Sequence, residues 1–288
     1  MKNLEKLIEL AQDLPESVKG NAVKLLTEMT TPIEGVGDTP LEWKPPFLRL
    51  VQGTTDRGSI PKSARIGDFV IGETLIEKPL VFIPLQIWNS RQYWDPDQTS
   101  NQMLCWSPDA LFGKIGRECK GCAHAEWVEN EGSDCGKTKS LIAITGDLSA
   151  IFMLNFSKSN YKIGTELHKA MTAARVNSYQ KKYGLNSITS TTAKNVENFK
   201  IEVLSDNLRN TPAELFPFLR ELFTRVSSDR KASIEIFYEL AKRRANDSTT
   251  LKIESDISET KLLENSTTTI EVVSEDQAVS PLAAKYKI

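Results

Sequence analysis

The sequence has few of the residues on which enzyme and secreted-protein sites usually depend. It contains two histidines, His124 and His168, and four cysteines among 288 residues. Its most apolar stretch, residues 140–156, is interrupted by Gly146 and Asp147 and is too short to span a bilayer. The first residues are amphipathic and include acids, so they lack the apolar centre of a signal peptide. We therefore expect a cytoplasmic protein and exclude membrane and secreted roles.

The sequence also lacks a recognisable catalytic constellation. With two histidines, nothing assembles into a nucleophile, a base and an orienting carboxylate. Residues 135–138, Cys-Gly-Lys-Thr, resemble the end of a phosphate-binding loop, but Glu131 stands where that pattern requires glycine. The composition, 40% hydrophobic and 26% charged, is that of an ordinary globular protein. We expect a protein that is not an enzyme; a nuclease built from scattered carboxylates is the third-ranked alternative.

Charge is distributed unevenly along the chain. Residues 1–39 hold four lysines and seven acidic residues, a net charge of −3. Residues 40–245 hold 28 basic and 23 acidic residues, a net charge of +5, and residues 246–288 hold four lysines and eight acidic residues, a net charge of −4. A basic body between acidic ends is typical of a protein that binds a polyanion. In the alternative interpretation, the net charge of +5 belongs to a solvated surface that binds no polyanion.

Apolar periodicity and turn residues predict an α+β protein. Apolar residues at helical spacing predict a helical hairpin over residues 1–30, broken at Pro15, and Gly and Pro mark residues 31–45 as a linker. Residues 46–210 read as a domain of short strands with one helix over 165–183, which Gly184 closes. The expected strands lie within residues 47–53, 67–74, 80–94, 139–145, 149–157 and 187–205.

The C-terminal part predicts two helices and a tail. Thr211 to Glu214 form a capping box that starts a first helix, and Ser228 with Asp229 can cap a second, within residues 211–245. From Asn246 the composition shifts to Ser, Thr and Glu without large aromatic residues until Tyr286. Residues 246–288 are therefore predicted to be a disordered acidic tail.

Side chains in the segment Leu80–Trp94 alternate between two faces, as in a β-strand. Val81, Ile83, Leu85 and Ile87 form one apolar set, and the other face carries Phe82, Gln86, Trp88, Gln92 and Trp94. Pro84 suits an edge position or a bulge rather than a regular ladder position, and a bulge there would turn Trp88 into the core.

All four cysteines fall within thirty-one residues, in the order Cys105, Cys119, Cys122 and Cys135. A Cys-x-x-Cys pair with two flanking thiolates can complete the tetrahedron of a structural Zn²⁺. Disulfides are disfavoured in the cytoplasm, and a thioredoxin-like pair lacks its usual strand-to-helix setting. We predict a structural zinc ion in loop 105–135, with His124 as an alternative ligand in place of Cys105 or Cys135.

Aromatic residues alternate with basic ones in two parts of the body, an arrangement that suits single-stranded nucleic acid. Each base offers a π-face for stacking, worth roughly 1–3 kcal/mol, and phosphates pair with Lys and Arg. Such contacts are predicted for Trp88, Arg91, Tyr93, Trp94, Trp106, Lys158, Tyr161, Lys162, Lys181 and Lys182. In the alternative interpretation, Trp88 and Trp94 cover a hydrophobic layer beneath the C-terminal helices and residues 158–182 are a solvated helix face.

Together, these features resemble the zinc-containing OB-fold single-stranded DNA-binding proteins of phage replication systems. The layout is also similar to the zinc-bearing OB domain of the large subunit of replication protein A. The resemblance covers residues 46–205 and rests on the Cys119-x-x-Cys122 cluster and the strand that carries Trp88. It implies an OB-like Greek-key β-barrel with an inserted four-cysteine zinc loop and, for a phage protein, a location in the host cytoplasm.

The predicted function is non-catalytic binding and protection of single-stranded DNA during replication or recombination. Replication or recombination proteins are the further partners expected, through the acidic tail or the N-terminal helices. The alternative is a zinc-loop protein–protein adaptor of a replication or transcription complex, in which nucleic-acid affinity is incidental.

Overall fold

The computed structural model describes residues 2–30, 45–53, 55, 57–94, 103–126, 133–191 and 197–264. The chain divides into a large unit, residues 1–244, and a small unit, residues 245–288. In the small unit, the described residues 245–264 are the end of helix α4. The two sheets lie in the large unit.

Two helices begin the chain, as the sequence predicts: α1 (Lys2–Gln12) and α2 (Glu16–Thr30). The carbonyl of Pro15 accepts the N–H groups of Val18 and Lys19, both at 3.0 Å, so Pro15 starts the second helix. Leu7 and Ala11 are fully buried and Leu26 nearly so. The hairpin thus places its apolar face in the core of the large unit.

The centre of the unit is a six-stranded antiparallel sheet with the order β7-β6-β4-β8-β9, in which β5 also pairs with β4. Its strands are β4 (Leu80–Trp94), β5 (Met103–Ser107), β6 (Cys135–Thr145), β7 (Ile151–Phe156), β8 (Lys181–Thr191) and β9 (Glu197–Asn210). Strands β4, β6 and β7 are neighbours in the sheet, with β5 between β4 and β6 in the chain, and the chain then returns through helix α3 (Tyr161–Ala173) so that β8 lies beside β4. This connectivity is a Greek key.

A second, three-stranded antiparallel sheet precedes it, built from β1 (Leu48–Leu50), β2 (Phe69–Ile71) and β3 (Thr74–Ile76). The bridge from Phe47 to Met153 places its first strand beside β7. Short 3₁₀ turns complete the described elements: η1 (Arg57–Ser59), η2 (Ala123–Ala125), η3 (Lys158–Asn160), η4 (Ser178–Gln180) and η5 (Ala213–Leu215).

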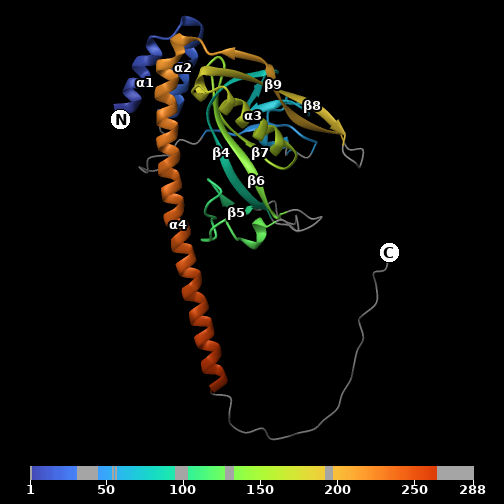
Figure 1. The fold of residues 1–288 in the computed structure, drawn as a ribbon, viewed down its shortest axis with the longest axis vertical. Coiled ribbons are helices and arrows are strands. Elements are labelled where there is room, and N and C mark those ends of the chain that lie inside the picture. The colour runs from blue at the N-terminus through green and yellow to red at the C-terminus, as the bar shows by residue number, and fades with distance from the viewer. Residues whose placement is uncertain are drawn as a thin grey trace. The chain divides into compact units, whose positions relative to one another are not determined.

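Two hydrophobic cores lie on opposite faces of the large sheet. One joins α1, α2 and the start of α4 (Phe216–Glu264) to Ile83, Leu85, Ile142 and Ile144. The other joins α3 and the small sheet to side chains from β4, β6, β7, β8 and β9, among them Phe82, Phe152 and Ile201. Figure 1 shows α1, α2 and the start of α4 together on one side of the strands. Both faces of the sheet are therefore covered over much of its area.

Strand β4 has its predicted bounds but not its predicted alternation. The register between β4 and β6 shifts between Pro84 and Gln86. Beyond this bulge Trp88 lies on the core side of Ile83 and Leu85, whereas Ile87 lies with Phe82 in the other core. The prediction that Ile87 shares the face of Ile83 and Leu85 is wrong. The extra residue in the bulge shifts the alternation by one, so each later side chain of β4 lies on the face opposite to the predicted one.

The helix predicted over residues 165–183 is displaced. Helix α3 ends at Ala173, and β8 begins at Lys181. Gly184 lies inside the strand instead of at a helix end, and a Cβ there would come within 3.2 Å of the Leu204 side chain. Gly184 allows close contact between β8 and β9, so this glycine belongs to strand packing and not to the end of a helix.

The C-terminal helices also differ from the prediction. A single helix, α4, begins at Phe216 and continues to Glu264, so Ser228 caps no second helix and residues 246–264 are helical. Thr211 makes no cap bond, since its buried hydroxyl has no described partner. Residues 265–288 of the predicted tail lie outside the described residues.

The mixed α+β class and the antiparallel sheets are as predicted. The predicted closed barrel is not confirmed, because the pairings among the described residues leave the sheet open between β7 and β9. The zinc loop between β5 and β6 likewise remains a prediction.

Candidate nucleic-acid interface and cysteine cluster

The strand register brings two of the cysteines beside one tyrosine. Tyr93 of β4 pairs with Cys105 of β5 on one side and with Cys135 of β6 on the other. Residues that are directly opposite in antiparallel strands project from the same face of the sheet. Cys105 and Cys135 therefore flank Tyr93 on one face, and the loop between β5 and β6 carries Cys119 and Cys122.

All four cysteines line one cavity, of about 20 Å³, together with Tyr93 and His124. A cavity of roughly 10–15 Å³ is enough for one water-sized particle, so this space has the scale of a single ion. The four thiols are free of disulfides. Among the described residues, no group of three or more His, Cys, Asp and Glu side chains is close enough to hold a metal ion in the present conformation. The geometry thus gathers the predicted ligands without forming a coordination shell.

Burial controls the protonation of the inner thiols. It raises the pKa of Cys135 and of Cys119, and the neighbouring thiols raise both further, whereas Arg91 opposes the shift. Without a cation, these thiols are therefore protonated near neutral pH.

His124 is held at the cavity by its ring and by an acid. Its ring stacks on Tyr93 with centroids 4.4 Å apart, and its Nδ1 lies 3.2 Å from the Asp134 carboxylate. The side chain lines the same cavity as the cysteines, so its alternative role as a ligand stays open.

Beside the cavity, basic side chains follow one another on the same face. Arg91 of β4 pairs with Lys137 of β6, and Asn89 pairs with Lys139. Alternation along both strands places Arg91, Lys137 and Lys139 on the face of Tyr93 and Cys135. Helix α3 adds His168, whose Nδ1 accepts a hydrogen bond of 3.0 Å from the Lys139 ammonium. We call Arg91, Lys137, Lys139 and His168 the basic strip.

The strip lies close against α3 because of one glycine. A Cβ on Gly164 would come within 2.9 Å of the Lys139 Cβ and 2.6 Å of the Phe156 Cβ. Lys139 is consequently only 7% exposed. Among the described residues, no acidic side chain forms an ion pair with any member of the strip.

The pKa values of Lys139 and His168 are both shifted by their surroundings. Burial lowers the pKa of Lys139. Burial also lowers the pKa of His168, and the Lys139 charge lowers it further. An anion at the pair would oppose both effects, since it favours the charged forms.

The predicted aromatic contacts separate onto different surfaces. Trp88 is half-buried against the core, with the Arg230 guanidinium 4.3 Å from its ring centroid. Trp106 pairs with Gln92 on that same α4 side, and its ring lies 4.7 Å from that of Phe237. Tyr93 lies on the cysteine side, and Trp94 at the end of β4 is 42% exposed. The structure therefore supports the core interpretation for Trp88.

The predicted lysines occupy two further places. Lys158 and Lys162 are exposed at and after η3, next to the half-buried Tyr161 that begins α3, the helix that carries His168. Lys181 and Lys182 begin β8, where Lys181 donates a 2.7 Å hydrogen bond to Asn210 and Lys182 lies near the Gly146 carbonyl. Burial and the Arg209 charge lower the pKa of Lys182. No described contact joins Lys181 and Lys182 to the basic strip.

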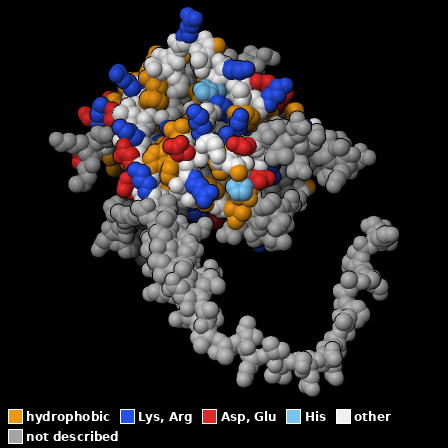
Figure 2. Space-filling model, turned by 60° about the horizontal axis from the view of Figure 1, so that its bottom comes forward, with side chains coloured by type: hydrophobic (Ala, Val, Ile, Leu, Met, Phe, Trp, Pro, Cys, Tyr) orange, Lys and Arg blue, Asp and Glu red, His pale blue; other side chains and the backbone are white. Residues whose placement is uncertain are grey.

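Sequence reasoning missed Lys137, Lys139 and His168. The signal that reveals the two lysines is their alternation along one strand, and the phosphate-loop pattern of residues 135–138 contains only Lys137. Basic side chains do not form one uniform patch on the face in Figure 2, where acidic and hydrophobic side chains lie among them. The strip is recognisable from strand register rather than from composition.

Helix α4 covers the opposite side of β4 with polar contacts. Gln86 donates a hydrogen bond of 3.3 Å to Ser227, and Tyr238 donates one to Asp109. Burial and the Asp109 carboxylate raise the pKa of Tyr238 to about 12. Among the described side chains, the buried atoms Gln86 Oε1, Thr138 Oγ1 and Arg230 Nε have no hydrogen-bond partner.

Comparisons with protein families, with curated proteins and with solved structures find no match to this chain. None of the helices within the described ranges combines the length and apolar character needed to cross a membrane.

Proposed function

We propose that the protein binds single-stranded DNA without catalysing a reaction, and that the basic strip is its main contact with the phosphates. The observation that carries this proposal is the pairing of Arg91 with Lys137 beside Lys139 and His168, with no described acid bonded to any of them. Cations arranged across neighbouring strands suit a chain of phosphates, whose counterions they displace.

Fold topology supports the same conclusion. The order β7-β6-β4-β8-β9, with α3 between β7 and β8, is compatible with an OB-type Greek key in which β4 would be the first strand. OB-folds are partly open barrels that bind oligonucleotides through their second and third strands and through the loops after the first and fourth strands. The cysteine loop follows β4 and β5, and the strip includes β6, so both occupy positions that this fold uses for binding.

Base stacking in this proposal rests on Trp94. It is the predicted aromatic on β4 with the greatest exposure, 42%, and it directly follows Tyr93 at the cysteine cavity. Because Arg91 and Tyr93 share one face of β4, alternation turns Trp94 toward the other face, so a strand that stacks on Trp94 would pass around the end of β4 to reach Arg91 and Lys137. Such a stack contributes roughly 1–3 kcal/mol.

The proposal includes one structural zinc ion held by Cys105, Cys119, Cys122 and Cys135. These residues line one ion-sized cavity, and thiolates are ligands that Zn²⁺ prefers. The metal would supply no reaction chemistry; it would fix the loop after β5 and hold Tyr93 and Arg91 beside it in place.

A titration tests the function. The full-length protein should bind a fluorescent single-stranded oligonucleotide more tightly than a duplex, and raised salt should weaken the binding. Replacing both Arg91 and Lys137 with Ala should weaken single-strand binding at low salt, whereas Lys24→Ala on α2 should not. Equal affinity of the double variant and the wild type would refute the strip as the contact surface.

A protein–protein adaptor is the second candidate, because the loop that carries Cys119 and Cys122 exposes apolar side chains. Leu111 is 67% exposed and Ile115 is 44% exposed. In an adaptor, replacing these residues with Ser would abolish partner capture, and replacing Arg91 and Lys137 would leave it intact.

A further inference from the structure

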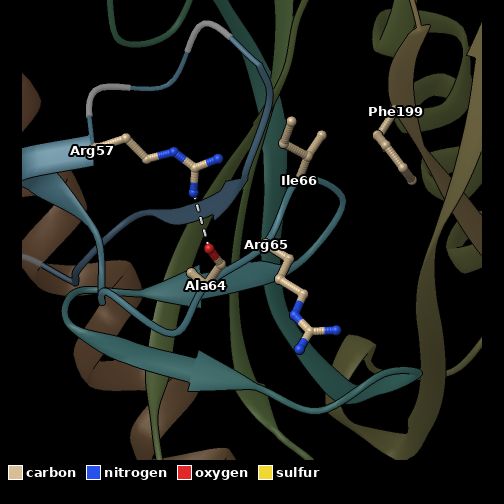
Figure 3. Close-up of a pocket in the computed structure, with 5 residues that line it drawn as sticks. All are labelled: Arg57, Ala64, Arg65, Ile66 and Phe199. Atoms are coloured by element: carbon tan, nitrogen blue, oxygen red, sulfur yellow. Dashed lines mark hydrogen bonds between the residues drawn. The ribbon is translucent and has the colours of Figure 1, made fainter.

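A second cavity lies away from the basic strip, where the small sheet meets β9. It has a volume of about 570 Å³ and is lined by Arg57, Ala64, Arg65, Ile66 and Phe199. It is open to solvent rather than enclosed, so a ligand there would keep part of its surface exposed. Figure 3 shows the Ile66 side chain between those of Arg57 and Phe199, with the Arg65 side chain extending away below them.

The aromatic wall of this cavity is fixed in place. The amide of Gln52 donates to the Phe199 carbonyl at 2.7 Å and accepts from the Phe199 N–H at 3.1 Å. The Phe199 ring lies against Gly67, where a Cβ would come within 2.6 Å of it. Gly67 also has a φ of +90°, a conformation that favours glycine. The ring is therefore a positioned surface and not a freely rotating side chain.

The Arg57 side chain on the cationic side of the cavity is oriented by a backbone carbonyl. Arg57 Nη1 donates to the Ala64 carbonyl at 2.9 Å, which leaves its other N–H groups available. No described acidic side chain forms an ion pair with Arg57 or Arg65. The acid nearest in sequence among the described residues, Asp68, accepts from the Arg65 backbone N–H at 2.8 Å and pairs with Lys78 at 3.2 Å.

Asp68 accepts its hydrogen bond from the Arg65 N–H and forms its ion pair with Lys78. Burial alone would raise the pKa of Asp68, but the Arg65 N–H, the Lys78 ammonium and the charge of the Arg65 guanidinium hold it below its ordinary value. The carboxylate is thus ionised near neutral pH and engaged with Lys78, while the Arg65 guanidinium, at the exposed end of an exposed side chain, can accept an anionic ligand.

We propose that this cavity binds a phosphate-bearing nucleotide unit, with its base between Ile66 and Phe199 and its phosphate on Arg57 and Arg65. A flat ring uses the apolar walls, and guanidinium groups suit phosphate. Inorganic phosphate alone would leave Phe199 and Ile66 unused, and an uncharged aromatic compound would leave both arginines unpaired. This site goes beyond the proposed function, because it uses none of the strip residues.

Calorimetric titration of the full-length protein with dAMP, deoxyadenosine and inorganic phosphate tests the site. We expect dAMP to bind at least about tenfold more tightly than either fragment, since only dAMP satisfies both halves of the cavity. Arg65→Ala should weaken dAMP binding by about tenfold, the effect of losing a charge-assisted hydrogen bond. Lys62→Ala, an exposed lysine of the same loop outside the lining, is the matched control and should bind as wild type.

A second variant separates the two halves of the site. Phe199→Leu should reduce the preference for dAMP over phosphate by roughly fivefold or more and keep phosphate binding, whereas Phe199→Tyr should retain both. Thermal melting of each variant shows whether it folds. Equal dAMP and phosphate affinities in the wild type, or wild-type dAMP affinity in Arg65→Ala, would overturn the proposal.

The source of the nucleotide and the link to the proposed function are also distinguishable. If the unit belongs to a strand, Arg65→Ala should weaken binding of long oligonucleotides, and the Arg91 and Lys137 double variant should leave dAMP binding unchanged. If the wild-type protein binds dAMP but no single strand, the cavity is a site for free nucleotide. The proposed function is then refuted, and the proposed cavity site is not. Single-strand binding that persists without any dAMP binding would refute only the cavity.

Discussion

The two ends of the paired strands β4 and β6 differ in what their side chains bury. At the end near Gly146, Phe82, Ile83, Leu85 and Ile144 are all 0% exposed. At the other end, Arg91 faces Lys137, and Tyr93 lies between two cysteines. We refer to these as the apolar end and the cysteine end.

The apolar end contributes mainly to stability, and we expect the cysteine end to contribute mainly to ligand binding. The apolar end joins both hydrophobic cores, so it contributes most of the free energy of folding in this region. The cysteine end places charged and polar groups where apolar contacts are few, a costly arrangement unless a ligand or metal offsets it. A substitution at one end should therefore have little effect on the property that depends on the other.

The largest expected effect is at the apolar end. Phe82→Ala should lower the free energy of unfolding by about 3–5 kcal/mol, because a fully buried ring is replaced by a cavity. The comparison is Ile188→Ala on β8, whose side chain is 42% exposed, which should cost less than about 1 kcal/mol. Urea unfolding measures both. A similar cost for both variants would contradict the assigned core.

Metal removal should act only at the cysteine end. The purified protein should contain about one zinc ion per chain, and chelation should speed amide hydrogen exchange in residues 103–126. Exchange around the buried Phe218 and Leu222 of α4 should not change. Elemental analysis that finds no metal, with four thiols titrating freely under native conditions, would remove zinc from the account.

Trp88 should behave as a residue of the core side. Trp88→Ala should cost about 2 kcal/mol of stability, less than a fully buried aromatic, because the side chain is half-buried. Its coupling to Arg230 in a double-mutant cycle should be about 0.5–1 kcal/mol. Trp94→Ala should instead leave stability unchanged and weaken single-strand binding. The reverse pattern would place the stacking surface at Trp88.

The smallest expected effect is a pH dependence. The pKa of His168 is lowered in the free protein, and a phosphate at the strip would raise it, so binding takes up a proton. Affinity for single strands should therefore increase as pH falls below about 6.5, by up to about tenfold for each unit by which the pKa is raised. His168→Ala, which keeps His124, should flatten the dependence. An identical profile in the variant would place the titrating group elsewhere.

The sequence predicts the local elements better than their relations. Leu80–Trp94 was predicted with its bounds, and the hairpin at Gly146 and the break at Pro15 are where turn chemistry placed them. For Pro84 the sequence leaves a bulge and an edge position as alternatives, and it misplaces Gly184 at a helix end, because both positions depend on a neighbouring strand rather than on local preference. The cysteines were grouped from spacing, but Lys139 and His168 meet only through the contact of α3 with β6, which no local pattern contains.

The most direct test of a single-strand surface at the cysteine end is lysine footprinting. Acetylation rates of the full-length protein would be compared with and without a saturating single-stranded oligonucleotide. The account predicts strong protection of Lys137, which is exposed in the free protein, and unchanged modification of Lys24, which lies on α2. Unprotected Lys137 in a complex that demonstrably forms would contradict the account and place the interface elsewhere.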